Sequence, residues 1–324
     1  MSDALEELLS RRLLIVTGKG GSGKTTVAAT LAVLAAQRGI DTVLVDLADG
    51  GDALNVVAKD PSAVPEGDGR SPVSISPHLS VLTIDPEVAL TEYLELELRF
   101  RPLARFIVHN AGFRLLLGAA PGWRDLITLG KLWHLATRET RGGRPWKLLV
   151  VDAPATGHGL SFLSIPRVVI EAVRLGPIRR HTDDVQAMLT DPAETLVVPV
   201  TLPEELPVRE TLELCRHVRA LGLETGPAVV NGVESAPEVP RLEELLAALS
   251  RNRPPAELER LLAPEIVQAA VEHASSRAAL HQGFIAQLRA ELGTSIACLP
   301  FLSEGVDGPV ALGRLGDALE SELT

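Results

Sequence analysis

The sequence of 324 residues contains little sulfur and few aromatic side chains. It has two cysteines, two methionines and 3% aromatic residues. Cys215 and Cys298 lie far apart and neither belongs to a CxxC pair, so the sequence predicts neither a disulfide framework nor a cysteine-based metal site. We expect both thiols to pack in a core built mainly from leucine, valine, alanine and isoleucine.

Basic charge is scarce relative to acidic charge. The formal net charge of −11 disfavours non-specific binding to nucleic acid or to anionic lipid, because that binding depends on lysine and arginine neutralising phosphates. The densest basic cluster consists of Arg174, Arg179, Arg180 and His181. We interpret it as a solvated helix face rather than a binding patch.

Long apolar runs are also missing from the sequence. The longest follows Lys24 and is too short and too rich in alanine and threonine to cross a bilayer. Residues 1–6 are acidic, whereas a secretory signal begins with basic residues. We therefore expect a cytoplasmic protein without stable membrane insertion.

The most informative segment that is present is a glycine-rich loop. Residues 18–25, GKGGSGKT, match the phosphate-loop pattern G-x-x-x-x-G-K-[ST]. The apolar run at 13–16 predicts a buried strand before the loop, and the run at 25–36, followed by Gly39, predicts a helix after it. Backbone N–H groups and the helix N-terminus would bind phosphates, and Lys24 would reach the terminal ones. The sequence therefore predicts a nucleoside triphosphate site.

The loop supplies most of the predicted nucleotide contacts. Thr25 is the expected Mg²⁺ ligand and Thr26 is expected near the α-phosphate. The full set of predicted contacts in this segment is Gly20, Gly21, Ser22, Gly23, Lys24, Thr25 and Thr26.

Further apolar runs predict a doubly wound α/β fold around a mostly parallel sheet. The additional expected strands are 42–45, 79–84, 148–151, 195–198, 228–230 and 295–299. Segment 58–76 is rich in proline, glycine, aspartate and serine and predicts a mobile surface loop. Two helix-rich regions, about 87–140 and 241–292, predict an inserted helical layer beside the sheet.

Two aspartates directly follow predicted strands. Asp46 follows the run at 42–45 and Asp152 follows the run at 148–151. The carboxyl ends of parallel strands meet at one edge of a sheet, where a phosphate-loop ATPase needs acidic groups for Mg²⁺ and the attacking water. We expect both carboxylates at the nucleotide site, although an aspartate at a strand end also suits an ordinary turn.

The residues around Asp152 carry a family resemblance. Segment 151–166, VDAPATGHGLSFLSIP, resembles switch II of the ArsA family, which comprises the arsenite-pump ATPase and the targeting ATPase for tail-anchored membrane proteins. Other stretches agree with the family in order: Ile84-Asp85-Pro86 with Glu92-Tyr93, Pro121-Gly122 with Asp125, Pro203-Glu204-Glu205-Leu206 with Glu210-Thr211, Val229-Val230-Asn231, and Leu299-Pro300. Because the resemblance spans nearly the whole chain, it implies a single domain over residues 1–324.

The resemblance implies roles for matched residues. Lys19 resembles the signature lysine of a deviant Walker A loop, which reaches across a dimer interface and stabilises charge on the transferring phosphoryl group. Asp46 resembles the switch I carboxylate that orients the attacking water, and Asp152 the switch II carboxylate near Mg²⁺, so Thr25, Asp46 and Asp152 form the implied metal set. Asn231 would read adenine, or would belong to an ordinary strand-end turn. Pro300 and Phe301 would pack near the base.

The sequence also departs from the family pattern. Switch I of the family reads D-P-A-H-x-L-S-D, whereas residues 46–54 read DLADGGDAL, so Asp49 or Asp52 could share the positioning of water. The targeting ATPase has a CxxC zinc motif and a methionine-rich groove, but here the only methionines are Met1 and Met188. The chain resembles a bacterial branch that keeps the motor and alters the client end.

These observations favour a Mg²⁺-dependent ATPase that works as a dimeric switch. We expect the chain to dimerise with itself or with a related subunit, and we expect the nucleotide state to control a helical layer that holds a protein or lipid-like partner. The alternative is a weakly hydrolysing or non-hydrolysing nucleotide sensor that stabilises a complex with a paralogous subunit. Positioning of membranes or chromosomes is disfavoured by the acidic C-terminal residues 317–324. A small-molecule kinase is disfavoured by Lys19 and the long switch II match.

Overall fold

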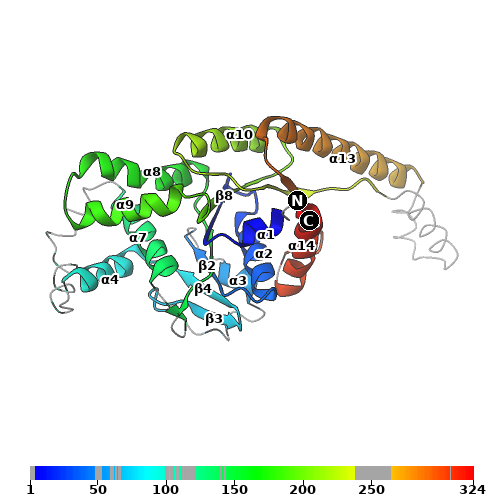
Figure 1. Cartoon of the computed structure of the whole chain (residues 1–324). Coiled ribbons are helices and arrows are strands. Elements are labelled where there is room, and N and C mark those ends of the chain that lie inside the picture. Colours follow the sequence, from blue (N-terminus) through cyan, green and yellow to red (C-terminus); the bar gives the residue numbers. More distant parts are fainter. Residues whose placement is uncertain are drawn as a thin grey trace.

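A sheet of eight strands runs through the centre of the molecule (Figure 1). The computed structural model describes residues 4–47, 53–58, 67–98, 122–138, 140–141, 144–237, 264–306 and 308–324, with single residues between 62 and 115. In spatial order the strands are β10 (Ile296–Pro300), β9 (Ala228–Val233), β8 (Thr195–Thr201), β1 (Leu13–Gly18), β7 (Leu148–Asp152), β2 (Thr42–Asp46), β4 (Leu79–Thr83) and β3 (Val73–Ser76). All neighbours pair in parallel except β3 with β4.

The predicted doubly wound fold is confirmed, and each of the seven predicted strands is present. Every residue of β1, β2, β7 and β8 is buried, because helices cover both faces of the sheet. This double burial is what makes these strands visible in the sequence as continuous apolar runs.

The prediction of a loop over 58–76 is wrong for its last four residues. Val73–Ser76 form β3, an edge strand antiparallel to β4. Within β3, Val73 and Ile75 are half-buried, while the alternating Ser74 and Ser76 are exposed. The apolar signal in the sequence therefore consists of only two residues. A further short ribbon, β5 (Thr140–Arg141) with β6 (Arg144–Pro145), was also absent from the sequence prediction.

Successive residues of β1 enter two different cores. Leu14 and Val16 face a core covered by helices α1 (Ala4–Leu9), α2 (Lys24–Gln37), α3 (Ala53–Val57) and α14 (Gly308–Leu323). Leu13 and Ile15 face the opposite core, which is covered by helices α7 (Trp123–Thr137), α8 (Thr156–Ala172), α9 (Pro177–Thr190) and α10 (Glu205–Ala220). This alternation follows from the two-residue period of a strand. Figure 1 shows the two groups of helices on opposite sides of the sheet.

Two more helices extend the second layer. Helix α4 (Pro86–Leu98) packs on α7, and α13 (Pro264–Leu292) packs on α10 above β9 (Figure 1). Both lie within the regions predicted to be helix-rich, whereas residues 241–263 lie outside the described part of the chain. That these helices form a subdomain of one domain over 1–324 stays a prediction.

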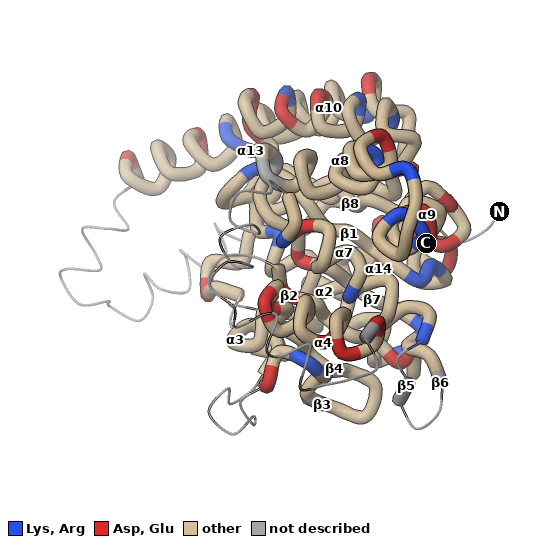
Figure 2. The backbone as a smooth tube through the Cα atoms, turned by 90° about the vertical axis from the view of Figure 1, so that its left-hand side faces the viewer, with Lys and Arg blue, Asp and Glu red and all other residues tan. Residues whose placement is uncertain are grey.

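Basic and acidic residues both occur along α10 and α13 (Figure 2). Two residues of the basic cluster, both on α9, have acidic neighbours. Arg179 Nε lies 2.8 Å from the Asp183 carboxylate, and His181 Nε2 lies 2.7 Å from Glu97 Oε1. These contacts agree with a helix face in solvent. Among the described residues, no helix is both long enough and apolar enough to cross a membrane.

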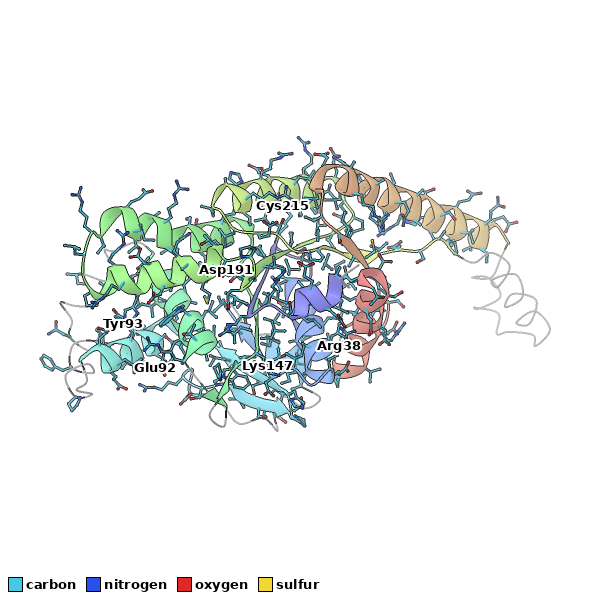
Figure 3. All side chains as sticks on the ribbon, in the orientation of Figure 1. Arg38, Glu92, Tyr93, Lys147, Asp191 and Cys215 are labelled. Atoms are coloured by element: carbon cyan, nitrogen blue, oxygen red, sulfur yellow. The ribbon has the colours of Figure 1, made fainter. Side chains whose placement is uncertain are left out.

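The cysteines pack as expected. Cys215 is buried on α10 (Figure 3), where loss of solvent raises the pKa of its thiol to about 11. Cys298 is partly buried on β10. It packs against the same cluster of buried side chains as Cys215, which lies between α10, α13, β9 and β10, and burial raises the pKa of its thiol as well.

Gly18, the last residue of β1, provides a test of sheet packing. A Cβ at this position would lie 2.0 Å from the backbone oxygen of Val200 on β8. We expect Gly18→Ala to lower the free energy of unfolding by about 1–3 kcal/mol, measured by urea denaturation without nucleotide.

Gly20→Ala is the matched control, because a Cβ there meets nothing within 4 Å. It should change the free energy of unfolding by less than about 0.5 kcal/mol. Equal stability of the two variants would contradict the close approach of β1 and β8.

Candidate functional site

The glycine-rich loop connects β1 directly to α2 and leaves its backbone open on one side. Gly21 and Gly23 adopt φ angles of +81° and +85°, which side-chain-bearing residues rarely adopt. A Cβ at Gly20 or Gly21 would meet nothing within 4 Å. The first N–H groups of α2 have no acceptor within the helix, so this end of α2 can bind an anion.

The other side of the loop rests on β9. Asn231 Nδ2 donates a hydrogen bond of 3.0 Å to the Ser22 carbonyl, and a Cβ at Gly23 would lie 2.1 Å from the same nitrogen. Glycine at position 23 is therefore required for space as well as for its φ angle. Asn231 therefore supports the loop from the side of β9 in this structure. The sequence did not predict this contact.

Two buried carboxylates lie beside the loop. Asp46 ends β2 and Asp152 ends β7, and the strand register places these two residues opposite each other. Both are buried, with exposures of 1% and 0%. Thr25 Oγ1 donates a 2.5 Å hydrogen bond to Asp152 Oδ2, and Asp46 Oδ2 accepts a 3.0 Å bond from the Ala53 N–H. The structure thus brings Thr25, Asp46 and Asp152 together, and their role as a metal set stays a prediction.

Both lysines of the loop are anchored. Lys24 Nζ donates to the Lys19 carbonyl at 3.2 Å, and burial lowers its pKa while the charge of Asp152 opposes that shift. Lys19 Nζ lies 3.0 Å from Glu210 Oε1 on α10. The ammonium of Lys19 is therefore bound within its own subunit in this structure.

The residues predicted to contact the base lie on the neighbouring strands β9 and β10 or, for Phe301, directly after β10. Pro300 ends β10 and pairs with Val233 of β9, and the Phe301 N–H donates to the Val233 carbonyl at 3.0 Å. The side chain of Phe301 is exposed, with 60% of its surface accessible. Asn231 joins this group to the loop through Ser22. Asp49 and Asp52, the alternative water-positioning residues, lie outside the described residues.

The arrangement fits a nucleoside triphosphate with Mg²⁺. The loop offers an open backbone surface, and its positive φ angle at Gly21 would strain any residue with a side chain. The buried Ser22 hydroxyl has no hydrogen-bond partner within the described part of the chain. Next to it, a hydroxyl and two carboxylates supply the oxygen donors that Mg²⁺ prefers.

Comparison with known proteins agrees with this geometry. The family model described as "Anion-transporting ATPase" matches residues 11–180, more than half of the chain. The chain belongs to this ATPase family.

Individual members of the anion-transporting ATPase family align over a longer part of the chain. "ATPase BagA" of Mycobacterium tuberculosis is 31% identical over 68% of this chain and 64% of its own length. "ATPase GET3" of Meyerozyma guilliermondii is 24% identical over 71% of this chain and 75% of its own, and the "ATPase ASNA1 homolog" of Entamoeba histolytica is 26% identical over 71% and 79%. The chain therefore spans less than two thirds of the length of BagA.

A pocket of about 790 Å³ lies in the helical layer of this family member, between α4, α7 and α9. Its wall is mainly apolar and includes Tyr93 and Trp133, whose rings both meet His181 edge-on. The polar part of the wall includes the buried Lys131. Its ammonium donates a hydrogen bond of 2.7 Å to the Arg70 carbonyl and lies 3.2 Å from Glu92 Oε2. Figure 3 shows Glu92 and Tyr93 on α4.

Sequence reasoning gave no role to three residues that touch the site. Glu210 binds Lys19, and Thr17 donates to the Pro154 carbonyl at 3.3 Å. A Cβ at Gly159 would lie 2.9 Å from both Pro154 O and Thr17 Oγ1, so this glycine lets α8 pack close to β1. The Gly157-His158-Gly159 run was the available signal for Gly159, and Glu210 lies in the family-like stretch 203–211, whereas nothing local marks Thr17.

The contact between Asn231 and the loop can be tested by stability. Asn231→Ala removes the donor to the Ser22 carbonyl, so we expect the free energy of unfolding without nucleotide to fall by about 1 kcal/mol. Asn231→Asp puts a carboxylate oxygen against that carbonyl and should lower it further. The measurement is urea denaturation, and two variants as stable as the wild type would show that Asn231 does not support the loop.

Proposed function

We propose that this chain is a Mg²⁺-dependent ATPase that works as a dimeric switch. The observation that carries the proposal is the 2.5 Å contact between Thr25 of the loop and Asp152 of β7, with Asp46 opposite on β2. This contact brings the proposed phosphate-binding loop next to the oxygens proposed to bind Mg²⁺ and to the carboxylate proposed to position the attacking water. Membership of a family of ATPases supports the same activity.

The phosphates would bind at the loop. Backbone N–H groups of residues 20–25 and the N-terminus of α2 supply hydrogen bonds and partial positive charge. Lys24 adds a full charge from a partly buried position, where burial already lowers its pKa because its ammonium is poorly solvated. A polyphosphate would replace that missing solvation, which favours the charged form of Lys24 when nucleotide binds.

Thr25, Asp152 and Asp46 would hold Mg²⁺. When bound, Mg²⁺ neutralises charge on the phosphoryl oxygens and orients them for in-line attack. Thr25 and Asp152 are already in hydrogen-bond contact, so their oxygens need little rearrangement to share a ligand. The buried Asp46 keeps one orientation through its bond to the Ala53 N–H, which suits it to direct a water molecule.

Lys19 would stabilise the charge that develops on the transferring phosphoryl group. We assign this contact to the partner subunit's nucleotide, because within its own subunit the Lys19 ammonium contacts Glu210 on α10. A cation supplied in this way contributes about 10³- to 10⁵-fold to the rate in other phosphate-loop enzymes. The partner is a second copy of the chain or a related subunit.

The nucleotide state would reach the helical layer through α8. Asp152 ends β7 and α8 begins at Thr156, so the connection between the two is short. Helix α8 packs on α7, α9 and α10, and α7 with α9 lines the pocket next to α4. A shift at Asp152 would therefore change the layer that we propose holds a protein client. The cytoplasmic location expected from the sequence stays a prediction.

The second candidate is a nucleotide sensor that binds ATP with little hydrolysis and stabilises a complex with a related subunit. The altered switch I favours it, because residues 46–54 lack the proline, histidine and serine of the family pattern. Asp46 itself is present and well held, so we prefer the enzyme.

Steady-state turnover separates the two candidates. We expect Mg²⁺-dependent phosphate release by the wild type, a fall of about 10²- to 10⁴-fold in kcat for Asp46→Asn, and a fall of about 10³-fold for Lys19→Ala. Because Lys24 and the loop backbone supply the proposed phosphate contacts, both variants should retain ATP binding, measured by equilibrium titration.

Lys24→Ala serves as the control that loses ATP binding. A wild-type protein that binds ATP but shows no Mg²⁺-dependent turnover, even at high protein concentration, would overturn the enzyme and support the sensor.

A further inference from the structure

The contact between Lys19 and Glu210 joins two residues that lie 191 positions apart in the chain. Lys19 Nζ and Glu210 Oε1 are 3.0 Å apart, within charge-assisted hydrogen-bond distance. Neither the phosphate-loop pattern nor the metal set requires an acidic residue at position 210. The pair therefore needs an explanation of its own.

The backbone position of Glu210 is fixed by the fold. Its neighbours Val208, Thr211 and Leu212 on α10 are buried, so the helix cannot turn without exposing them. The backbone of Lys19 is also held, since its carbonyl accepts bonds from Lys24 Nζ and the Ser22 N–H. The long side chain of Lys19 is the part that can move.

The ion pair is weak enough to open. The side chains of Lys19 and Glu210 are 37% and 43% exposed, and an exposed pair of this kind favours its closed form by no more than about fivefold. A triphosphate carries several negative charges against the single charge of Glu210. The ammonium would therefore leave Glu210 when a polyphosphate comes within its reach.

We propose that Glu210 is a positioning residue that holds Lys19 in its own subunit until the nucleotide of the partner subunit competes for it. This inference rests on the proposed function, because it gives Lys19 its role across the dimer. Glu210 thereby opposes formation of the active dimer and keeps the turnover of separate subunits low. Removal of its charge releases Lys19 without removing any group that contacts phosphate or metal.

The first test measures the availability of Lys19 and needs no turnover. The nucleotide-free protein is treated briefly with acetic anhydride, and acetylation at Lys19 is quantified by mass spectrometry relative to the exposed Lys147 (Figure 3). Glu210→Gln should raise the relative acetylation of Lys19 by about two- to fivefold, because the ammonium is no longer shielded. Glu213→Gln, an exposed position on the same helix, should leave it unchanged. Unchanged acetylation in Glu210→Gln would overturn the inference.

The second test measures phosphate release as a function of protein concentration. Glu210→Gln should lower the concentration that gives half-maximal turnover by about two- to fivefold, with the maximal rate unchanged. In a Lys19→Ala background the same substitution should have no effect, because its action passes through Lys19. Thermal unfolding confirms that the variants are folded.

A lower maximal rate in Glu210→Gln, or an equal effect with and without Lys19, would overturn the positioning role. Absence of turnover in the wild type would instead overturn the proposed ATPase, because the acetylation result does not depend on hydrolysis.

Discussion

The candidate site depends on one partly buried hydrogen bond, from the Thr25 hydroxyl to the fully buried Asp152 carboxylate. It joins the start of α2 to the end of β7 and so fixes the phosphate loop relative to the sheet. Asp152 is fully buried, and a buried carboxylate is tolerated only where hydrogen bonds or positive charge compensate its lost hydration. Thr25 and the nearby Lys24 provide that compensation. The same groups that stabilise the carboxylate are those that would bind Mg²⁺ and phosphate.

Around this bond the site is held from three directions. Parallel pairing of β2 with β7 brings Asp46 opposite Asp152, β9 supports the loop through Asn231, and α10 binds Lys19 through Glu210. Each support comes from a different element of the sheet or its covering helices. Because these elements are close-packed, each support holds its part of the loop in one position. Helix α10 also packs on α8, which packs on the pocket helices α7 and α9.

The four central strands that the sequence revealed share one physical property, which is complete burial. Strands such as β1 and β7 are covered on both faces and appear as unbroken apolar runs. The helix α2 was equally visible, since Gly39 ends it at φ +75° with its N–H bonded to the Ala36 carbonyl. The edge strand β3 was missed because one of its faces is exposed and only Val73 and Ile75 carry a signal.

The sequence by itself determined the chemistry of the chain: glycines at the turn into α2, a lysine and threonine at its start, and aspartates at two strand ends. These are local features, because backbone conformation and strand boundaries depend mainly on neighbouring residues. Only the tertiary structure decided which groups meet. The opposition of Asp46 and Asp152 requires the register of β2 on β7. The contacts of Asn231 with Ser22, 209 positions apart, and of Glu210 with Lys19 arise from packing between distant elements, for which no local pattern exists.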